Sequence, residues 1–148
     1  MLNEDYKDML QCFAAEGVRF LLVGAYALAA HGYPRATLDI GFWVDPTREN
    51  ARAVLRALAR FGAPLDQLSE DDMTRHDTIF QMGVPPRRID IITGADGLSF
   101  EETHARAQRI EVDGMGVRIP NREDMIRNKR ASGRKKDLLD AEWLEENP

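Results

Sequence analysis

Two apolar runs on either side of a short alanine-rich segment constrain the fold of this chain more than any other feature. The runs cover residues 19–23 and 38–44. Because the first run is continuously apolar after Arg19, it predicts a strand that is covered on both faces. Gly24 then turns the chain into residues 25–30, whose small side chains favour a helix lying close to a sheet. The stretch therefore predicts a strand, a turn, a short helix and a second strand.

The rest of the chain adds helices and further strands. Helical spacing, capping residues and turn residues predict the following elements: a helix between Asn3 and Gly17, a helix between Thr47 and Gly62, strands at 78–83 and 88–93, a short helix at 100–106, a hairpin of 109–112 and 117–119 across Asp113-Gly114, and two helices after Asn121 that are separated at Gly133. Strands and helices alternate at first, and strands then cluster. This order predicts a mixed sheet packed with helices, in the α/β (or α+β) class.

Length and composition limit the classes of protein to consider. The chain has 148 residues, which favours one domain over 1–148 that includes the helical tail 121–148. The net charge of -5 argues against duplex DNA as a partner. The single cysteine, Cys12, excludes an intrachain disulfide, and we expect it to be a buried neutral thiol. Without a long apolar run or a signal-peptide pattern, we expect no membrane partner and a cytoplasmic location.

Two carboxylates stand inside apolar runs and need a physical reason. Asp39 lies within residues 38–44, and Asp90 is flanked by isoleucines. Burial of an isolated carboxylate costs several kcal/mol unless the group is paired or binds a metal. Asp39 is therefore either a structural carboxylate, paired for example with Arg35, or part of a functional site. The repetition of the pattern at Asp90 favours a functional site.

These residues form a pattern that resembles the signature of the nucleotidyltransferase superfamily. In this signature a hydrophobic residue precedes Gly-Gly or Gly-Ser, Asp-x-Asp or Asp-x-Glu follows after a spacer, and a third carboxylate lies on another strand. The chain has Val23-Gly24-Ala25, Asp39-Ile40-Gly41 and Ile89-Asp90-Ile91. Residues 26–37 and the tail 128–137 are also similar to small bacterial proteins of this fold, including toxin-like proteins related to the AbiEii group.

The resemblance implies a fold, a reaction and roles for named residues. The fold would be a nucleotidyltransferase-like mixed sheet. The reaction would be Mg²⁺-dependent transfer of a nucleotide from an NTP to an RNA or protein acceptor, and a cognate antitoxin would be a further partner. Asp39 and Asp90 would be catalytic metal ligands, and Gly24 and Ala25 would form the phosphate-binding turn. Arg35, Lys129 and Arg134 would contact phosphates.

The chain departs from the family pattern at two positions. Ala25 replaces the second Gly or Ser, which keeps the backbone N–H. Gly41 replaces the second carboxylate, which removes a side chain expected to bridge two metal ions. Asp45 cannot substitute for it, because four residues along a strand span about 13 Å. The pattern therefore predicts impaired transfer. The alternative is a non-catalytic nucleotide-binding or interaction module, such as a toxin–antitoxin component or regulator on a degenerate transferase scaffold.

Several polar groups have a simpler structural interpretation that the sequence leaves open. Arg35 either contacts phosphate or pairs with Asp39. Lys129 and Arg134 either face the nucleotide or belong to a solvated basic face with Arg134–Asp137 and Lys136–Asp140 pairs. The acidic run 70–72 is expected to be a solvated face rather than a metal cluster. His31 is expected at a helix end, bound by backbone carbonyls, unless it contacts substrate.

Overall fold

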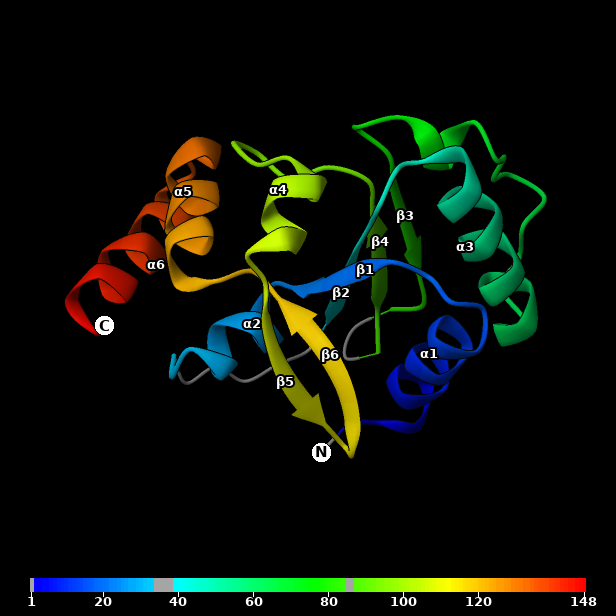
Figure 1. The fold of residues 1–148 in the computed structure, drawn as a ribbon, viewed down its shortest axis with the longest axis horizontal. Helices are drawn as coiled ribbons and strands as arrows, with labels where there is room; N and C mark the ends of the chain where they lie inside the picture. The colour runs from blue at the N-terminus through cyan, green and yellow to red at the C-terminus, as the bar shows by residue number, and fades with distance from the viewer. Residues whose placement is uncertain (1, 34–38, 85–86) are drawn as a thin grey trace.

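The computed structural model describes residues 2–33, 39–84 and 87–148 of the chain (Figure 1). In chain order the elements are α1 (Glu4–Ala15), β1 (Phe20–Val23), α2 (Ala25–Ala30), β2 (Ile40–Val44), α3 (Arg48–Phe61), the 3-10 helix η1 (Asp72–Thr74), β3 (Ile79–Met82), β4 (Ile89–Ile92), α4 (Phe100–Ala105), β5 (Gln108–Val112), β6 (Met115–Ile119), α5 (Arg122–Ser132) and α6 (Lys135–Glu146). The predicted mixture of strands and helices is confirmed. Within the described part of the chain, no helix is long and apolar enough to cross a membrane.

Four strands form a mixed sheet in the order β1-β2-β4-β3. β1 is antiparallel to β2, β2 is parallel to β4, and β3 is antiparallel to β4. The register places Val23 opposite Gly41, and Gly41 opposite Asp90. Three segments that are far apart in the sequence therefore meet in one row across the sheet.

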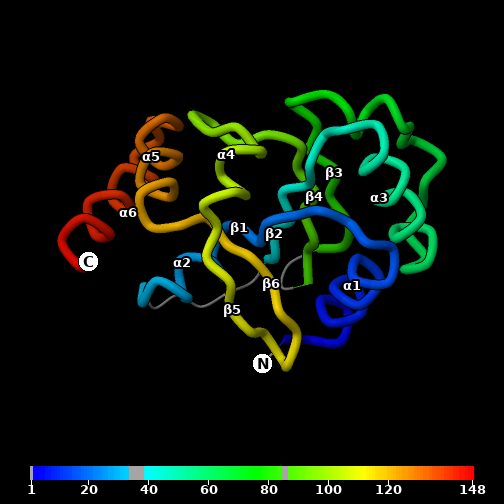
Figure 2. Tube along the Cα trace, in the orientation of Figure 1, coloured from blue at the N-terminus to red at the C-terminus, as the bar shows by residue number. Residues whose placement is uncertain are grey.

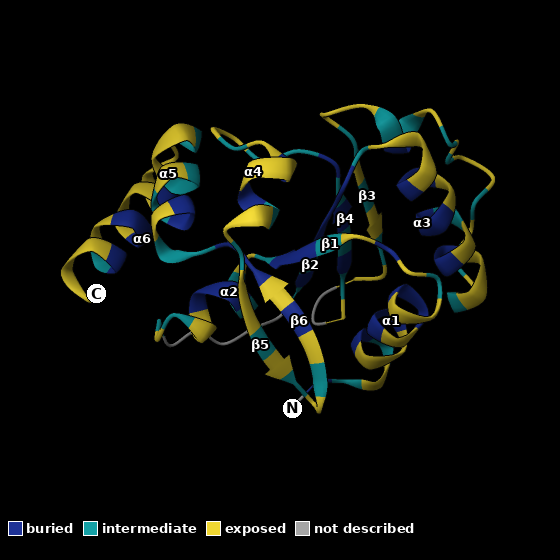
Figure 3. Cartoon of the chain, in the orientation of Figure 1, coloured by how far each residue is buried: buried dark blue, intermediate teal, exposed yellow. Residues whose placement is uncertain are grey.

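One face of this sheet carries the main hydrophobic core. Residues from β1, β2 and β4, among them Leu22, Phe42 and Ile91, are fully buried there with side chains of α1 and α3. Figure 3 shows the inner sides of α1 and α3 as buried and their outer sides as exposed. Successive residues of a strand point to opposite faces. The other face therefore receives Val23, Gly41, Asp90 and their neighbours, and it is the face that positions the candidate site.

The expected capping residues explain where the longer helices begin and end. The Asn3, Thr47 and Asn121 side chains accept hydrogen bonds from backbone N–H groups in the first turns of α1, α3 and α5. Gly62 and Gly133 end α3 and α5 in the left-handed conformation. These predicted helix boundaries are confirmed.

The predicted hairpin is the two-stranded sheet β5–β6. Its turn residues, Asp113 and Gly114, both have positive φ, as a two-residue hairpin turn requires. Figure 2 shows β6 running beside β1, and the chain begins near the tip of the hairpin. There the backbone N–H of Leu2 donates to Asp113 Oδ2 at 3.1 Å. The hairpin thus covers one edge of the main sheet.

One expectation about the second strand is wrong. β2 begins at Ile40, so Asp39 precedes the strand instead of lying in its middle. The Asp39 side chain keeps 30% of its surface exposed and that of Asp90 keeps 22%. Because a partly solvated carboxylate costs less than a buried one, the energetic argument for a special role is weaker than the sequence suggests.

Candidate functional site

The two carboxylates of the sequence pattern lie on the same face of the sheet. Asp90 is the neighbour of Gly41 across the parallel β2–β4 pair, and Asp39 precedes Gly41 by two residues. Side chains two residues apart on a strand share a face. The structure therefore brings Asp39, Gly41 and Asp90 together, as the sequence predicts.

The guanidinium of Arg88 lies between the two carboxylates. Its Nη2 is 2.7 Å from Asp39 Oδ2, and its Nε is 3.5 Å from Asp90 Oδ1. Arg88 directly precedes β4 and lies two residues before Asp90, so both side chains point to the same face. The Tyr6 hydroxyl donates to the Arg88 carbonyl at 3.0 Å, and burial raises the pKa of this phenol to about 12. Arg88 is the cation that compensates both carboxylates among the described residues.

One oxygen of each carboxylate is buried and has no hydrogen-bond partner. These atoms are Asp39 Oδ1 and Asp90 Oδ1. Arg88 Nε and Asp90 Oδ1, 3.5 Å apart, form an ion pair without hydrogen-bond geometry. The guanidinium charge therefore lies close to Asp90, but its N–H does not donate a hydrogen bond to this oxygen. Burial raises the pKa of Asp90, with a further contribution from Asp39, while Arg88 opposes the rise. Arg88 Nε is likewise buried without a hydrogen-bond partner, so an unpartnered donor lies 3.5 Å from Asp90 Oδ1. Two acceptor oxygens and one N–H thus lack partners here, where an ion, a proton or a polar ligand atom can bind.

The turn after β1 reaches the same end of the sheet. Val23, the last residue of β1, lies opposite Gly41 near the start of β2. Gly24, the next residue, therefore lies at the same end of the sheet as Asp39, which directly precedes β2. Gly24 has φ 79° and ψ −144°, a conformation that residues with a Cβ avoid. Ala25 begins α2 directly after it. The Gly24-Ala25 turn and the two carboxylates are therefore neighbours, which the spacing alone did not establish.

Gly41 leaves little space for a side chain. A Cβ at this position would lie 3.2 Å from Val23 Cγ2 and 3.5 Å from the Val23 carbonyl oxygen. The first distance is short for carbon atoms, which prefer about 3.5–4.0 Å. A carboxylate at position 41 would thus require a small movement of Val23.

A cleft of about 520 Å³ opens beside this row of residues. Its walls come from the end of β1 and α2, from the site face of β2, β3 and β4, and from α5 and α6. The polar residues that line it are Asp96, Asn128, Lys129, Ser132, Arg134 and Asp137, and the apolar ones include Val23, Trp43, Ile92 and Met125. Trp43 and Ile92 lie two residues beyond Gly41 and Asp90, about 7 Å along each strand. Asp39 and Asp90 therefore lie near the cleft without lining it.

Lys129 and Arg134 face the cleft, and both are paired with acids. Lys129 Nζ lies 3.2 Å from Asp137 Oδ1 and 3.3 Å from Asp140 Oδ2, and Arg134 Nε lies 3.0 Å from Asp137 Oδ2. The predicted Arg134–Asp137 pair is confirmed, whereas Asp140, expected to pair with Lys136, pairs with Lys129. Lys129 is not on a solvated face, because 15% of its side chain is exposed, while Arg134 is 80% exposed.

A second cavity of about 720 Å³ adjoins the cleft and shares Trp43, Ile79 and the segment 94–96 with it. It is rich in carboxylates: Asp45, Asp77, Asp96 and Glu101 line it. Trp43 is 1% exposed, and its indole N–H has no partner among the described residues. A buried indole N–H usually finds an acceptor, so the orphaned donor marks the junction of the two cavities as a place for a polar ligand atom.

The other candidate residues do not join the site. Asp45 is buried and pairs with Arg19 at 2.8 Å. The acidic run 70–72 pairs with exposed arginines of α3 and with Arg75, as expected for a solvated ionic face. His31 Nε2 lies 3.0 Å from the Pro120 carbonyl oxygen, which fits its structural interpretation. Arg35 lies outside the described residues.

The residues present fit one divalent ion better than two. No group of three His, Cys, Asp or Glu side chains in the described ranges is arranged to hold a metal. Two carboxylates with one unpartnered oxygen each match the usual binding of Mg²⁺, which takes one or two carboxylates and completes its shell with water and substrate phosphates. Gly41, where the family pattern has a carboxylate, offers no side-chain ligand.

Comparison with known proteins gives a likeness in fold. No protein-family model matches the chain, and no curated protein sequence matches it. Among solved structures, the chain is similar to a crystal structure from Thermotoga maritima that is described as a putative nucleotidyltransferase, with a TM-score of 0.61 and 15% identity. The match covers 99% of this chain and 94% of that one. The chain therefore has a nucleotidyltransferase-like fold.

Sequence reasoning missed Arg88 and the Trp43 indole as parts of the site. Both could have been found from strand alternation, because Arg88 shares a face with Asp90, and Trp43 shares one with Gly41. The orphaned N–H could not have been found, because it depends on what the neighbouring strands and α4 place around the ring.

Proposed function

We propose that this chain binds a nucleoside triphosphate and one Mg²⁺ ion in the cleft, on a nucleotidyltransferase scaffold, and that it transfers a nucleotide weakly. The observation that carries this proposal is the grouping of Asp39, Asp90 and the Gly24 turn beside a cleft whose opposite wall bears Lys129 and Arg134. The fold likeness supports the same class of chemistry.

Each part of the cleft has a role in this proposal. The triphosphate lies between the Gly24-Ala25 turn and the cations of α5 and α6, because backbone N–H groups and ammonium or guanidinium groups favour anionic oxygens. Asp39 and Asp90, each with one unpartnered oxygen, would hold the ion, which would supply positive charge to the phosphates. The nucleoside lies against the apolar wall that includes Trp43.

Two features of the site limit transfer. Gly41 supplies no bridging carboxylate, so a second ion lacks a protein ligand. Arg88 already compensates Asp39 and Asp90, so an ion competes with a guanidinium that contacts Asp39 at 2.7 Å. Without a second ion to activate the attacking hydroxyl, we expect binding to exceed catalysis.

The second candidate function is a non-catalytic nucleotide-binding or interaction module, such as a toxin–antitoxin component. The Arg88 ion pairs favour it, because a guanidinium between two carboxylates supplies the positive charge that an ion would supply. The carboxylate-rich second cavity disfavours a long polyanion such as RNA in that part of the surface.

The test combines calorimetry with a transfer assay. Wild type is titrated with ATP, GTP, CTP and UTP, with and without Mg²⁺, and is incubated with labelled NTP and RNA, tRNA or protein acceptors. The Gly41→Asp variant, alone and with Val23→Ala to release the 3.2 Å contact, restores the missing ligand. Gly41→Asn is the matched control, because it has nearly the same size without the charge.

The outcomes separate the two functions. Transfer that rises in Gly41→Asp and not in Gly41→Asn supports the ancestral site. Mg²⁺-dependent NTP binding without transfer in any variant supports the non-catalytic module. If no NTP binds to wild type or to either variant, the nucleotide proposal is wrong.

A further inference from the structure

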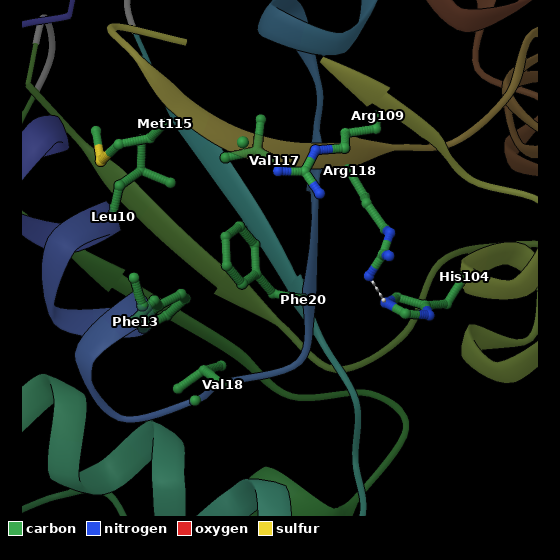
Figure 4. A pocket seen from close by; sticks show the side chains of 12 residues that line it. Leu10, Phe13, Val18, Phe20, His104, Arg109, Met115, Val117 and Arg118 are labelled. Carbon is green, nitrogen blue, oxygen red and sulfur yellow. Dashed lines mark hydrogen bonds between the residues drawn. The ribbon is translucent and has the colours of Figure 1, made fainter. Parts of the chain in front are cut away.

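A third pocket lies beside β1, which is an edge strand of the main sheet. Its volume is about 300 Å³, roughly that of ten water molecules at about 30 Å³ each. It is bordered by α1, by the start of β1, by the hairpin and by His104 of α4. None of the described residues that line it also lines the cleft. Figure 4 shows apolar side chains on one side of this pocket and basic side chains on the other.

The apolar side of the pocket is formed by side chains that pack against one another. Leu10, Phe13 and Val117 are buried, and the half-buried Phe20 and Met115 contribute to its wall. The rings of Phe13 and Phe20 pack edge to face at 5.2 Å, which fixes the aromatic part of the surface. A small apolar group placed here would meet carbon atoms on several sides.

The basic side carries charge that the described residues do not compensate. Arg109 and Arg118 are direct partners across the β5–β6 pair, where like charges destabilise. The Arg109 guanidinium lies over Gly116, since a Cβ there would be 2.4 Å from its Nη2. Glu111 shares this face by register, yet the ion pairs of the described part of the chain include neither arginine. Two adjacent guanidinium groups without an acid create a local anion preference.

His104 adds a conflict that an anion would remove. Its Nδ1 lies 3.4 Å from Arg19 Nη2, and its Nε2 lies 3.5 Å from Arg118 Nη1. A neutral imidazole has one donor and one acceptor nitrogen, so one of these contacts places two N–H donors face to face. Burial and the two arginines lower the pKa of His104, which keeps the ring neutral. Arg19 itself is compensated by Asp45 at 2.8 Å and Glu101 at 3.7 Å.

We propose that this pocket binds a small amphipathic anion, with a carboxylate or phosphate head on Arg109, Arg118 and His104 and a short apolar body against Phe20 and Met115. The head would accept hydrogen bonds from guanidinium groups that repel one another without it. The volume suits a ligand of about ten non-hydrogen atoms. This inference does not depend on the proposed function, because the pocket and the cleft share no described lining residue.

Two probes of this size distinguish the head groups: phenyl phosphate and hexanoate. Binding to the full chain is followed by ¹H–¹⁵N NMR, with the Gly17 and Gly116 amides as reporters because both residues line the pocket. Phenol and hexanol lack the charge, and inorganic phosphate and acetate lack the apolar body. We expect at least one probe to bind about tenfold more tightly than its neutral and its tailless counterparts, a difference of about 1.4 kcal/mol.

Variants test which groups bind the probe. Arg118→Gln and, independently, Arg109→Gln should weaken binding about fivefold or more, because each variant loses a charge-assisted hydrogen bond to the head group. Ala14→Phe fills the pocket from an exposed position of α1 and should also weaken binding. Arg75→Gln removes the same charge outside the pocket and should leave the Kd within about twofold.

The results that overturn the proposal are equally specific. It is wrong if phenol binds as tightly as phenyl phosphate and hexanol as tightly as hexanoate. It is also wrong if the probes change amide chemical shifts elsewhere in the chain but not at Gly17 and Gly116. It is equally wrong if both arginine variants are folded, as dispersed spectra would show, and bind the probes as tightly as wild type does. Binding of one head group and not the other supports the proposal and identifies the ligand class.

Discussion

Replacement of Arg88 by methionine tests how the two carboxylates are held in the absence of an ion. The variant keeps an apolar stem and removes the charge that lies 2.7 Å from Asp39 and 3.5 Å from Asp90. The Coulomb attraction of a 2.7 Å pair is about 6 kcal/mol at an effective dielectric of about 20, before desolvation is subtracted. Exposed pairs contribute at most about 1 kcal/mol. For a pair that is one-third exposed we expect a loss of about 2 kcal/mol.

This loss should depend on pH in a definite direction. Burial raises the pKa of Asp90 in the folded protein above its ordinary value. Protonated Asp90 therefore stabilises the fold below the ordinary pKa, and this contribution is lost as the pH rises through the pKa of the folded protein. Removal of Arg88 raises this pKa further. The Tm of the variant should therefore equal that of wild type near pH 4 and should fall below it as the pH rises toward 8. At pH 8 we expect a Tm lower by about 4–8 °C for a chain of this size.

The assay is thermal unfolding by circular dichroism from pH 4 to pH 8, with and without Mg²⁺. Mg²⁺ should raise the Tm of Arg88→Met more than that of wild type, because the guanidinium no longer competes for Asp39. Arg87→Met is the matched control, since the neighbouring Arg87 is exposed and pairs with exposed Asp5 at 3.3 Å. A deficit that is the same at pH 4 and pH 8, or that Mg²⁺ does not reduce, would refute this reasoning.

Three further predictions concern stability and reactivity. Asp124→Asn should destabilise the fold by about 2–3 kcal/mol in urea unfolding, because this carboxylate is 2% exposed and accepts two hydrogen bonds from Arg106; an unchanged midpoint would contradict the role of that pair. Gly24→Ala should cost about 1–3 kcal/mol by the same measurement, since φ is 79° there, and a neutral result would mean that the turn relaxes freely. Cys12 should react slowly with a thiol reagent in the native state at pH 8 and rapidly in urea, because burial raises the pKa of its thiol; equal rates would contradict this.

The sequence was most informative where local rules decide the structure. Asn3, Thr47 and Asn121 begin helices for a chemical reason that is visible in a few neighbouring residues, and the Asp113-Gly114 turn fixes the hairpin. That Val23, Gly41 and Asp90 lie in one row could not be predicted without the strand order, which places the non-consecutive strands β2 and β4 side by side.

The candidate site was less predictable because its energetics are set by neighbours from other strands. Asp39 was expected inside a buried strand and instead precedes β2, partly exposed, with Arg88 as its cation. That partner lies 49 positions along the chain, and the parallel register alone brings the two together. Lys129 lines the cleft, and its contact with phosphate stays a prediction. Its pairing with two acids depends on how α6 packs against α5.

The two edges of the main sheet differ in how they meet solvent. β1 pairs only with β2, but β6 of the hairpin packs against it, whereas β3 pairs only with β4 among the described strands. This second edge presents Ile79, 66% exposed, and it is followed by Val84, 74% exposed. An open edge with apolar side chains is a template for adding a strand from another molecule. Self-association in concentrated solution should therefore begin at β3, and a lysine at position 79 would be the simplest change that improves solubility.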